Sequence, residues 1–340
     1  MISNRMTHEL SLPTIPVRYL AEMCARSGAT QSAIARALGE ASLPPSALRH
    51  SGLRVSVIQL ERFYRALRRE TGDEMFGYFE RPVPPGSYAT IVRLMTSCGD
   101  IASALDASFR FYRLFDHQHY WRVEEAAGRV TVTIDPRDAD QRASIYFSHI
   151  MLISPWRTAA WLSARPVAVL EVRLQPRFRR FASETRYLFG CEPTFARGNP
   201  AIVLPADLLR YRVVREPAQA DEYVATSLRH HVLAPEQTTL ESELRALLSA
   251  AKPFADLGLP EAARRLGMSR ASLARKLADQ GLSFQRLKDE LRRDQAIALL
   301  TNGSRSIADI AELLGYSAPS AFQRAFRDWT GLPPGRLRKR

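Results

Sequence analysis

The apolar positions of the chain first follow a helical period. Leu20, Met23 and Cys24 recur at i, i+3 and i+4, and the same spacing returns between residues 57 and 67. This period predicts a group of short, packed helices from residue 17 to about residue 79. The polar stretch 1–16, which contains two prolines, predicts a loose leader.

The period then changes from helical to alternating. After a proline-rich connection at 81–88, Asp100 predicts the N-cap of a helix that continues to residue 112. Residues 120–123 and 129–134 alternate around a turn at 126–128, which predicts a β-hairpin. A helix is expected over 143–164, and strands over 167–174 and 201–204. The first part of the chain is therefore predicted to be an α+β domain of helices and a small, mainly antiparallel sheet.

Helical periodicity returns at 221–248, is interrupted at Pro235, and continues beyond Lys252-Pro253 to the end of the chain. A length of 340 residues fits two domains. We therefore expect a first domain at 17–215, a helical connector at 216–251 and an all-α domain at 252–340.

Residues 259–281 predict two short helices around a tight turn. Gly267 can adopt the left-handed conformation that ends a helix, and Ser269 can cap the next one. Leu273 and Leu277 then face the core. This spacing is that of a helix-turn-helix, whose second helix enters the major groove of DNA.

The same pattern recurs over 306–331. Ser306 and Asp309 resemble a capping box, with Asp in place of Glu. The equivalents of the turn glycine, the second cap and the two inward side chains are Gly315, Ser317, Phe322 and Phe326. Residues 284–300 contain no helix breaker and predict one helix that links the two units.

Residues 308–338, ADIAELLGYSAPSAFQRAFRDWTGLPPGRLR, resemble the signature of the AraC/XylS family, including its closing Gly331-x-x-Pro334. Residues 17–210 are similar, more diffusely, to the arabinose-binding-like regulatory domain of one branch of that family. The resemblance implies a DNA-binding transcription regulator, usually an activator. The resemblance also implies that the first domain senses an effector. Dimerisation is common in the family, and residues 216–251 are the candidate element for it.

The family's base contacts can be carried over residue by residue. Arg275 is expected to carry most of the direct readout by the first unit, because alanine can only touch a thymine methyl group. Arg270 shares its outward face. The complete set of expected DNA-binding residues is Arg270, Ala271, Ala274, Arg275, Pro319, Ser320, Gln323 and Arg324.

The charge of the chain agrees with a polyanionic partner. Lys plus Arg number 48 and Asp plus Glu 35, which gives +13 and a pI of 10.1. Residues 252–340 contain 17 Lys/Arg and 9 Asp/Glu, a net +8. A general coding bias toward arginine is the alternative explanation. Further cations could bind phosphates or only water: Arg264, Arg265, Lys276, Arg305 and Arg327.

The segment 108–121, SFRFYRLFDHQHYW, is rich in aromatic residues. Tyr112, His117 and Trp121 are candidates for binding an effector that the sequence does not identify. The alternative, which we favour, is the buried stripe of a helix. His117 and His119 have no evident third ligand, so no metal and no other cofactor is expected.

Catalysis by the first domain makes demands that the sequence does not meet. Cys24, Cys98 and Cys191 are far apart, so they predict a reducing compartment and cannot form the zinc-holding cluster of a DNA-repair module. An amidase-like module needs a reactive cysteine on a strand-to-helix elbow, yet Cys98 follows a helical stretch. We expect no enzyme. A purely architectural DNA-binding protein would not need a mixed first domain of some 200 residues.

The N-terminus lacks the apolar stretch of a signal peptide, and no window is apolar enough to span a membrane. The expected location is the bacterial cytoplasm, on the nucleoid when bound to DNA. The expected partners are double-stranded promoter DNA, RNA polymerase, a small-molecule effector and a second copy of the chain.

Overall fold

The computed structural model describes residues 14–116, 120–232, 240–250, 257–279, 282–302 and 305–337. These residues divide into two compact units. The described residues within 1–20, 35–63 and 238–340 belong to the first unit, and those within 21–34 and 64–237 belong to the second.

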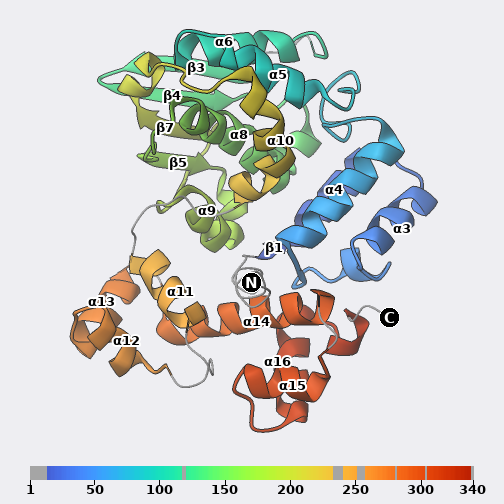
Figure 1. The fold of residues 1–340 in the computed structure, drawn as a ribbon, viewed down its shortest axis with the longest axis vertical. Coiled ribbons are helices and arrows are strands. Elements are labelled where there is room, and N and C mark those ends of the chain that lie inside the picture. The colour runs from blue at the N-terminus through green and yellow to red at the C-terminus, as the bar shows by residue number, and fades with distance from the viewer. Residues whose placement is uncertain are drawn as a thin grey trace. The chain divides into compact units, whose positions relative to one another are not determined.

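The second unit contains a five-stranded sheet of order β3-β4-β7-β5-β6 (Figure 1). Every neighbouring pair is antiparallel except β5 and β6. The small, mainly antiparallel sheet predicted from the sequence is therefore confirmed. Its strands are β3 (Trp121–Ala126), β4 (Arg129–Ile134), β5 (Glu171–Leu174), β6 (Thr194–Phe195) and β7 (Ala201–Pro205).

The predicted hairpin is formed by β3 and β4. Ala127 and Gly128 connect the strands with φ of 49° and 72°. Positive φ at both central residues is the signature of a type I′ turn, whose twist matches that of the strands. The strand expected over 167–174 is shorter than predicted, because only residues 171–174 join the ladder.

Helices cover the sheet of the second unit. The long helix α8 packs on β4 and is buried along most of its length. Ser144 caps it by accepting a hydrogen bond from the Phe147 N–H at 3.0 Å. Asp100 caps α6 as predicted, with the Ser103 N–H at 2.8 Å. The helices are α5 (Ser87–Thr96), α6 (Ile101–Tyr112), α7 (Ala139–Ala143), α8 (Ile145–Ser163), α9 (Ala182–Phe189) and α10 (Pro217–Val232).

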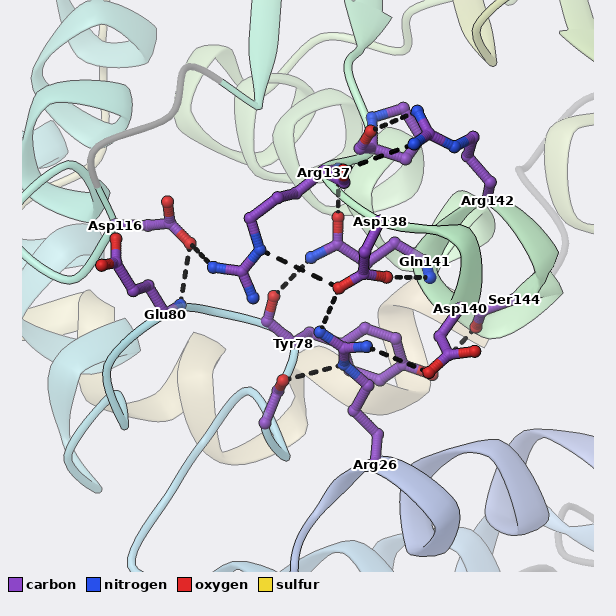
Figure 2. A network of polar contacts seen from close by, with 12 residues as sticks. Arg26, Tyr78, Glu80, Asp116, Arg137, Asp138, Asp140, Gln141, Arg142 and Ser144 are labelled. Atoms are coloured by element: carbon purple, nitrogen blue, oxygen red, sulfur yellow. Dashed lines mark hydrogen bonds and ion pairs between the residues drawn. The ribbon is translucent and has the colours of Figure 1, made fainter.

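A network of polar contacts joins distant segments of the second unit (Figure 2). Arg26 bonds Asp138 at 2.6 Å and also donates to the Gly77 carbonyl at 2.9 Å. Arg137 bonds the buried carboxylate of Asp116 at 3.1 Å. Asp116 thereby gains the partner that a buried charge requires.

The N-terminal region of the chain combines helices with a small β-ribbon. Its helices are α2 (Arg18–Arg26), α3 (Gln31–Glu40) and α4 (Val57–Thr71). β1 (Thr14–Pro16) pairs antiparallel with β2 (Arg54–Ser56). The leader predicted over 1–16 was therefore wrong at residues 14–16, while residues 1–13 lie outside the described part of the chain.

The first unit also contains the predicted all-α region. Its helices are α11 (Leu240–Ala250), α12 (Leu259–Arg265), α13 (Arg270–Asp279), α14 (Phe284–Asn302), α15 (Ile307–Leu313) and α16 (Pro319–Thr330), followed by the 3₁₀ turn η4 (Pro334–Arg336). Pro235 and the expected boundary at Lys252-Pro253 lie outside the described residues.

Candidate nucleic-acid interface

The first helix-turn-helix consists of α12 and α13. Gly267 has a φ of +66° and ends the turn after α12, as its position in the sequence predicted. The Ser269 hydroxyl accepts from the Ser272 N–H at 3.1 Å, which confirms it as the cap of α13. Leu273 and Leu277 are buried in an apolar core that also includes leucines of α11. The outer face of α13 is thus left to solvent.

The second helix-turn-helix consists of α15 and α16. Ser306 and Asp309 form the predicted capping box, with both reciprocal hydrogen bonds at 3.0 Å. Gly315 has the expected left-handed φ of +77°. Phe322 and Phe326 are fully buried and lie 5.7 Å apart between ring centroids. The two units therefore share one construction with different core side chains.

One cap differs from the prediction. Ala318, not Ser317, is the N-cap of α16, and it makes no side-chain capping bond. The helix begins at Pro319, whose missing N–H costs nothing in the first turn. Proline also disfavours the helical region for the residue before it. Ala318 is accordingly extended, with φ −149° and ψ 144°.

The closing Gly-x-x-Pro motif ends α16. Gly331 is the C-cap of α16 and has a φ of +74°. A Cβ atom at this position would lie 3.2 Å from Nδ1 of His50, so a side chain would be both strained and crowded. The buried Thr330 hydroxyl donates to the Phe326 carbonyl at 2.7 Å and accepts from the Leu332 N–H at 3.2 Å. These bonds hold the segment that follows α16 against the second helix-turn-helix.

The expected DNA-binding side chains lie on the exposed faces of α13 and α16. The buried residues of α13 are Leu273 and Leu277, and those of α16 include Phe322 and Phe326. The residues exposed to solvent include the whole expected set: Arg270, Ala271, Ala274, Arg275, Pro319, Ser320, Gln323 and Arg324. None of the large hydrophobic side chains that are exposed lies on α13 or α16.

The basic side chains of the first helix-turn-helix differ in their partners. Glu261 bonds both Arg264 and Arg265, with N···O distances of 2.7 Å. Hydrogen bonds from these two guanidinium groups lower the pKa of Glu261 to about 2. Within the described residues, by contrast, no ion pair is found for Arg275. Arg275 can therefore meet an external acceptor without first breaking a salt bridge.

The linking helix α14 extends slightly beyond the predicted range of 284–300. Ala296, Ile297 and Leu300 are completely buried on it. At its N-terminal half, the Lys288 ammonium group donates to the Leu257 carbonyl at 2.8 Å. A helix held by core contacts along its length is a firm connection between the two units.

A charged contact holds α11 against α14. Arg245 bonds Glu241 at 2.9 Å and Glu290 at 2.8 Å. Burial opposes the charge of Arg245, but the two carboxylates outweigh it and raise its pKa above the ordinary value. The contact between Arg245 and Glu290 does not follow from the sequence pattern. The Glu241–Arg245 spacing of four residues is the one signal that could have indicated it.

The β-ribbon formed by β1 and β2, which belongs to the first compact unit, also bonds to α14. Arg54 donates to the Thr14 carbonyl at 2.6 Å, and the Thr14 hydroxyl bonds Asp294 of α14. Arg293 bonds the same carboxylate at 3.2 Å. The sequence pattern does not predict this contact, because 280 residues separate Thr14 from Asp294.

The structure brings together two of the three effector candidates. Trp121 packs against Tyr112 at 5.4 Å, stacks on Phe109 at 4.8 Å, and donates its indole N–H to the Met151 carbonyl at 2.8 Å. Phe79 meets Tyr112 edge-on at 5.3 Å. His117 lies outside the described residues. Tyr112 and Trp121 therefore belong to a half-buried aromatic cluster.

Cys98 lies just beyond the end of α5, not on a strand-to-helix elbow. Burial, together with the nearby charge of Asp100, raises the pKa of its thiol. A raised pKa lowers the fraction of thiolate, which is the nucleophilic form. The environment of Cys98 does not activate it.

Within the described ranges, no helix is both long enough and apolar enough to cross a membrane. The same ranges contain no cluster of three or more His, Cys, Asp or Glu side chains arranged to hold a metal ion.

Comparison with known proteins gives two family matches. Residues 32–213 match the arabinose-binding domain found at the N-terminus of AraC transcription regulators, and residues 262–340 match a helix-turn-helix domain. The ornithine utilization regulator of Pseudomonas aeruginosa is 24% identical over 339 residues, which cover 96% of each chain. VqsM, a transcriptional regulator of the same organism, is 37% identical over 98 residues, or 27% of this chain and 30% of that one.

Among solved structures, the regulator CdpR of Pseudomonas aeruginosa is similar over 73% of this chain and 81% of that chain. Its sequence identity is 20% and the TM-score is 0.31. The family assignment does not depend on that similarity, because the match at residues 32–213 covers more than half of the sequence and is followed by the helix-turn-helix match. The chain therefore belongs to the AraC/XylS family of transcription regulators, in the branch with an arabinose-binding-type N-terminal domain.

Proposed function

We propose that this regulator activates transcription by placing both helix-turn-helix units on promoter DNA, under the control of a small molecule bound to its N-terminal domain. The observation that carries the proposal is that all the expected DNA-binding residues are exposed, on two helices whose opposite, apolar faces are buried. A recognition helix needs this division, because one face must hold the domain together while the other meets base edges.

The side chains of the two units suggest different modes of reading. Arg275 can bond guanine with two hydrogen bonds, and Gln323 can do so with adenine. Arg324 adds a second guanine reader, and Ser320 can bond either class of base. Ala271, Ala274 and Pro319 can contribute only apolar contacts, such as those with thymine methyl groups.

Positions around these readers suit the phosphate backbone. Arg270 lies at the start of α13 and is exposed, as are Lys276 and Arg327. Phosphate contacts fix the register of a protein on DNA without reading sequence. We assign Arg264 and Arg265 a smaller part, because Glu261 already bonds both.

The N-terminal domain is assigned the effector site and a part in homodimerisation. Tyr112, His117 and Trp121 remain the candidate effector residues, and the dimer is assigned from the family. RNA polymerase is the partner that an activator requires, and the cytoplasm, where bacterial DNA lies, is the proposed location. No catalytic role is proposed, since the matching relatives are transcription regulators.

Footprinting of the full chain on its own promoter tests the DNA-binding part. Two recognition helices on one face of DNA should protect two patches per protomer about one helical turn, ~34 Å, apart. Arg275→Ala should weaken one patch and Arg324→Ala the other. A single short patch, unaffected by one of these variants, would show that only one unit docks.

Thermal unfolding tests the effector part. A molecule that binds only the folded state raises the melting temperature, by an amount that grows with the ratio of its concentration to its Kd. Ornithine is the first probe, because the relative that aligns over the whole chain is an ornithine utilization regulator. A broader set of small metabolites follows, with Trp121→Ala as the variant that should lose any shift. A ligand that stabilises both proteins equally would place the effector site elsewhere.

A further inference from the structure

The strand β3 leaves one edge of the five-stranded sheet open. It is the first strand in the order β3-β4-β7-β5-β6, and no other described strand pairs with its outer edge. Five of its six residues are exposed, and Trp121 is half-buried. Val123, at the middle of this edge, is 39% exposed although it is apolar. An open edge of this length is a template for another strand.

The hairpin turn decides which backbone groups face outward. A two-residue turn closes on a hydrogen-bonded pair, here Ala126 and Arg129, and bonded pairs then alternate along an antiparallel ladder. Arg122 and Glu124 therefore direct their backbone groups toward β4. The N–H and C=O groups of residues 121, 123 and 125 point away from the sheet.

Two bonds just beyond the ladder agree with this alternation. The Asp135 N–H donates to the Tyr120 carbonyl at 2.8 Å, so residue 120 also faces β4. The Ile134 N–H donates to the Pro200 carbonyl at 2.9 Å, so residue 134 faces β7 rather than β3. The backbone N–H and C=O groups of Trp121, the cross-strand neighbour of residue 134, therefore point to the outer side of the sheet.

Side-chain directions separate the charges of β3 into two groups. Successive residues of a strand point to opposite faces, so Arg122 and Glu124 share one face and Glu125 lies on the other. Glu125 bonds Arg210 of its own chain at 2.8 Å. No ion pair is found within the described residues for Arg122 or Glu124. These two opposite charges, two positions apart, are available to a partner.

Among the three registers centred on the middle of β3, at residues 122, 123 and 124, these constraints favour one for two copies of the chain. Two antiparallel edges related by a two-fold axis must place outward-bonding residues opposite each other. A register centred on Arg122 sets arginine against arginine, and one centred on Glu124 sets glutamate against glutamate. Centring on Val123 sets Arg122 opposite the partner's Glu124, twice by symmetry. Opposite charges in directly facing positions stabilise a sheet, and like charges destabilise it.

We propose that two copies of this regulator associate through their β3 edges, in the register centred on Val123. The two sheets then form one continuous sheet with two Arg122–Glu124 pairs across the two-fold axis. This inference names the surface of the homodimer assigned above and rests on that part of the proposed function. Edge charges often serve to keep strands apart. Here the alternation of positive Arg122 and negative Glu124 disfavours the registers centred on these two residues and favours the register centred on Val123.

Sedimentation velocity of the full chain over a range of concentrations tests the surface. Arg122→Glu and Glu124→Arg each replace two attractive pairs with two repulsive ones, so each alone should weaken self-association about tenfold or more. An equimolar mixture of the two variants should dimerise again, because each strand then faces complementary charges. The double variant should also recover the homodimer. Arg129→Glu is the matched control, since it makes the same charge change on β4, one strand away from the edge.

A backbone variant tests the hydrogen bonds rather than the charges. Val123→Pro removes an N–H group that the isolated sheet does not use, and proline is tolerated on an edge strand for that reason. It should leave the circular dichroism spectrum unchanged and abolish the dimer. The proposal is overturned if the native chain stays monomeric at every concentration, if both single charge variants dimerise like the native chain, or if their mixture fails to restore association.

DNA binding is measured separately, on a duplex that contains one site. The charge variants should bind this duplex as the native chain does, because β3 belongs to the second compact unit and both recognition helices to the first. A native chain that fails to bind promoter DNA refutes the proposed function but leaves the sedimentation result to decide the dimer surface.

Discussion

Replacement of Arg275 by alanine tests whether the first helix-turn-helix reads a base directly. Arg275 is exposed on α13, and no ion pair within the described residues holds its guanidinium group. Contact with DNA therefore breaks no salt bridge. A bidentate arginine–guanine contact discriminates by about 1–3 kcal/mol. We expect Arg275→Ala to weaken binding to the cognate site by about 5- to 150-fold.

Arg264→Ala is the matched control. It removes the same charge from the preceding helix, but Arg264 already bonds Glu261 through two hydrogen bonds of 2.7 and 2.8 Å. Its loss should reduce the affinity for all sequences by a similar, small factor, because a backbone contact carries no base information. The two variants thus differ in specificity more than in charge.

Fluorescence anisotropy at one fixed salt concentration distinguishes the two outcomes. The cognate duplex is compared with duplexes in which each base pair under the first unit is changed in turn. Arg275→Ala should flatten the preference at one or two positions and change non-specific affinity much less. Equal weakening on every duplex would refute direct reading by Arg275. Specificity would then depend on Ser320, Gln323 and Arg324 of the second unit.

Four other variants or conditions test the interpretation. Phe322→Ala should lower the free energy of unfolding by about 3–5 kcal/mol in urea denaturation, because the ring is completely buried. Ala296→Pro should cost about 3 kcal/mol or more and abolish the two-patch footprint, because proline breaks a buried turn of α14; survival of both fold and footprint would disprove the rigid link. Glu261→Gln should release Arg264 and Arg265 and steepen the salt dependence of DNA binding by about one phosphate contact. Burial lowers the pKa of His149 to about 3, so the folded chain keeps this imidazole neutral while the unfolded chain takes up a proton on acidification. Between pH 7 and pH 5 the free energy of unfolding of the native chain, measured by urea denaturation, should therefore fall by up to about 2 kcal/mol more than that of the His149→Asn variant.

The helix-turn-helix units could be predicted because their signals are local. Gly267 and Gly315 adopt the positive φ that their places after a short helix predicted. Ser306 and Asp309, three residues apart, form both bonds of the capping box. Each of these features depends on residues within one or two helical turns, so the order of residue types was sufficient.

The Ser317 cap was predicted by analogy with Ser269, and the analogy failed because of one inserted residue. The second unit has an extra position between its turn glycine and its first buried aromatic residue. Pro319 begins α16 there and forces Ala318 into an extended conformation. The constraint imposed by proline on its neighbour outweighed the hydroxyl's preference for the cap position. Alignment of the repeats on Pro319 would have given the right boundary.

Asp294 shows why other features could not be derived from local pattern. Its place on a helix with many charged residues suggests a solvent-exposed side chain, yet it is only 8% exposed. A carboxylate can be buried at this position because Thr14, Arg54 and Arg293 approach it. Two of these residues lie in the β-ribbon, far away in the sequence, and the ribbon itself is two strands of three residues each. Strands so short carry no readable alternation, so neither the ribbon nor the burial of Asp294 follows from periodicity. Only the folded chain brings the acid and its partners together. Thr14→Val should therefore lower the free energy of unfolding, measured by urea denaturation, by about 1–3 kcal/mol, because the buried carboxylate of Asp294 loses a hydrogen-bond donor.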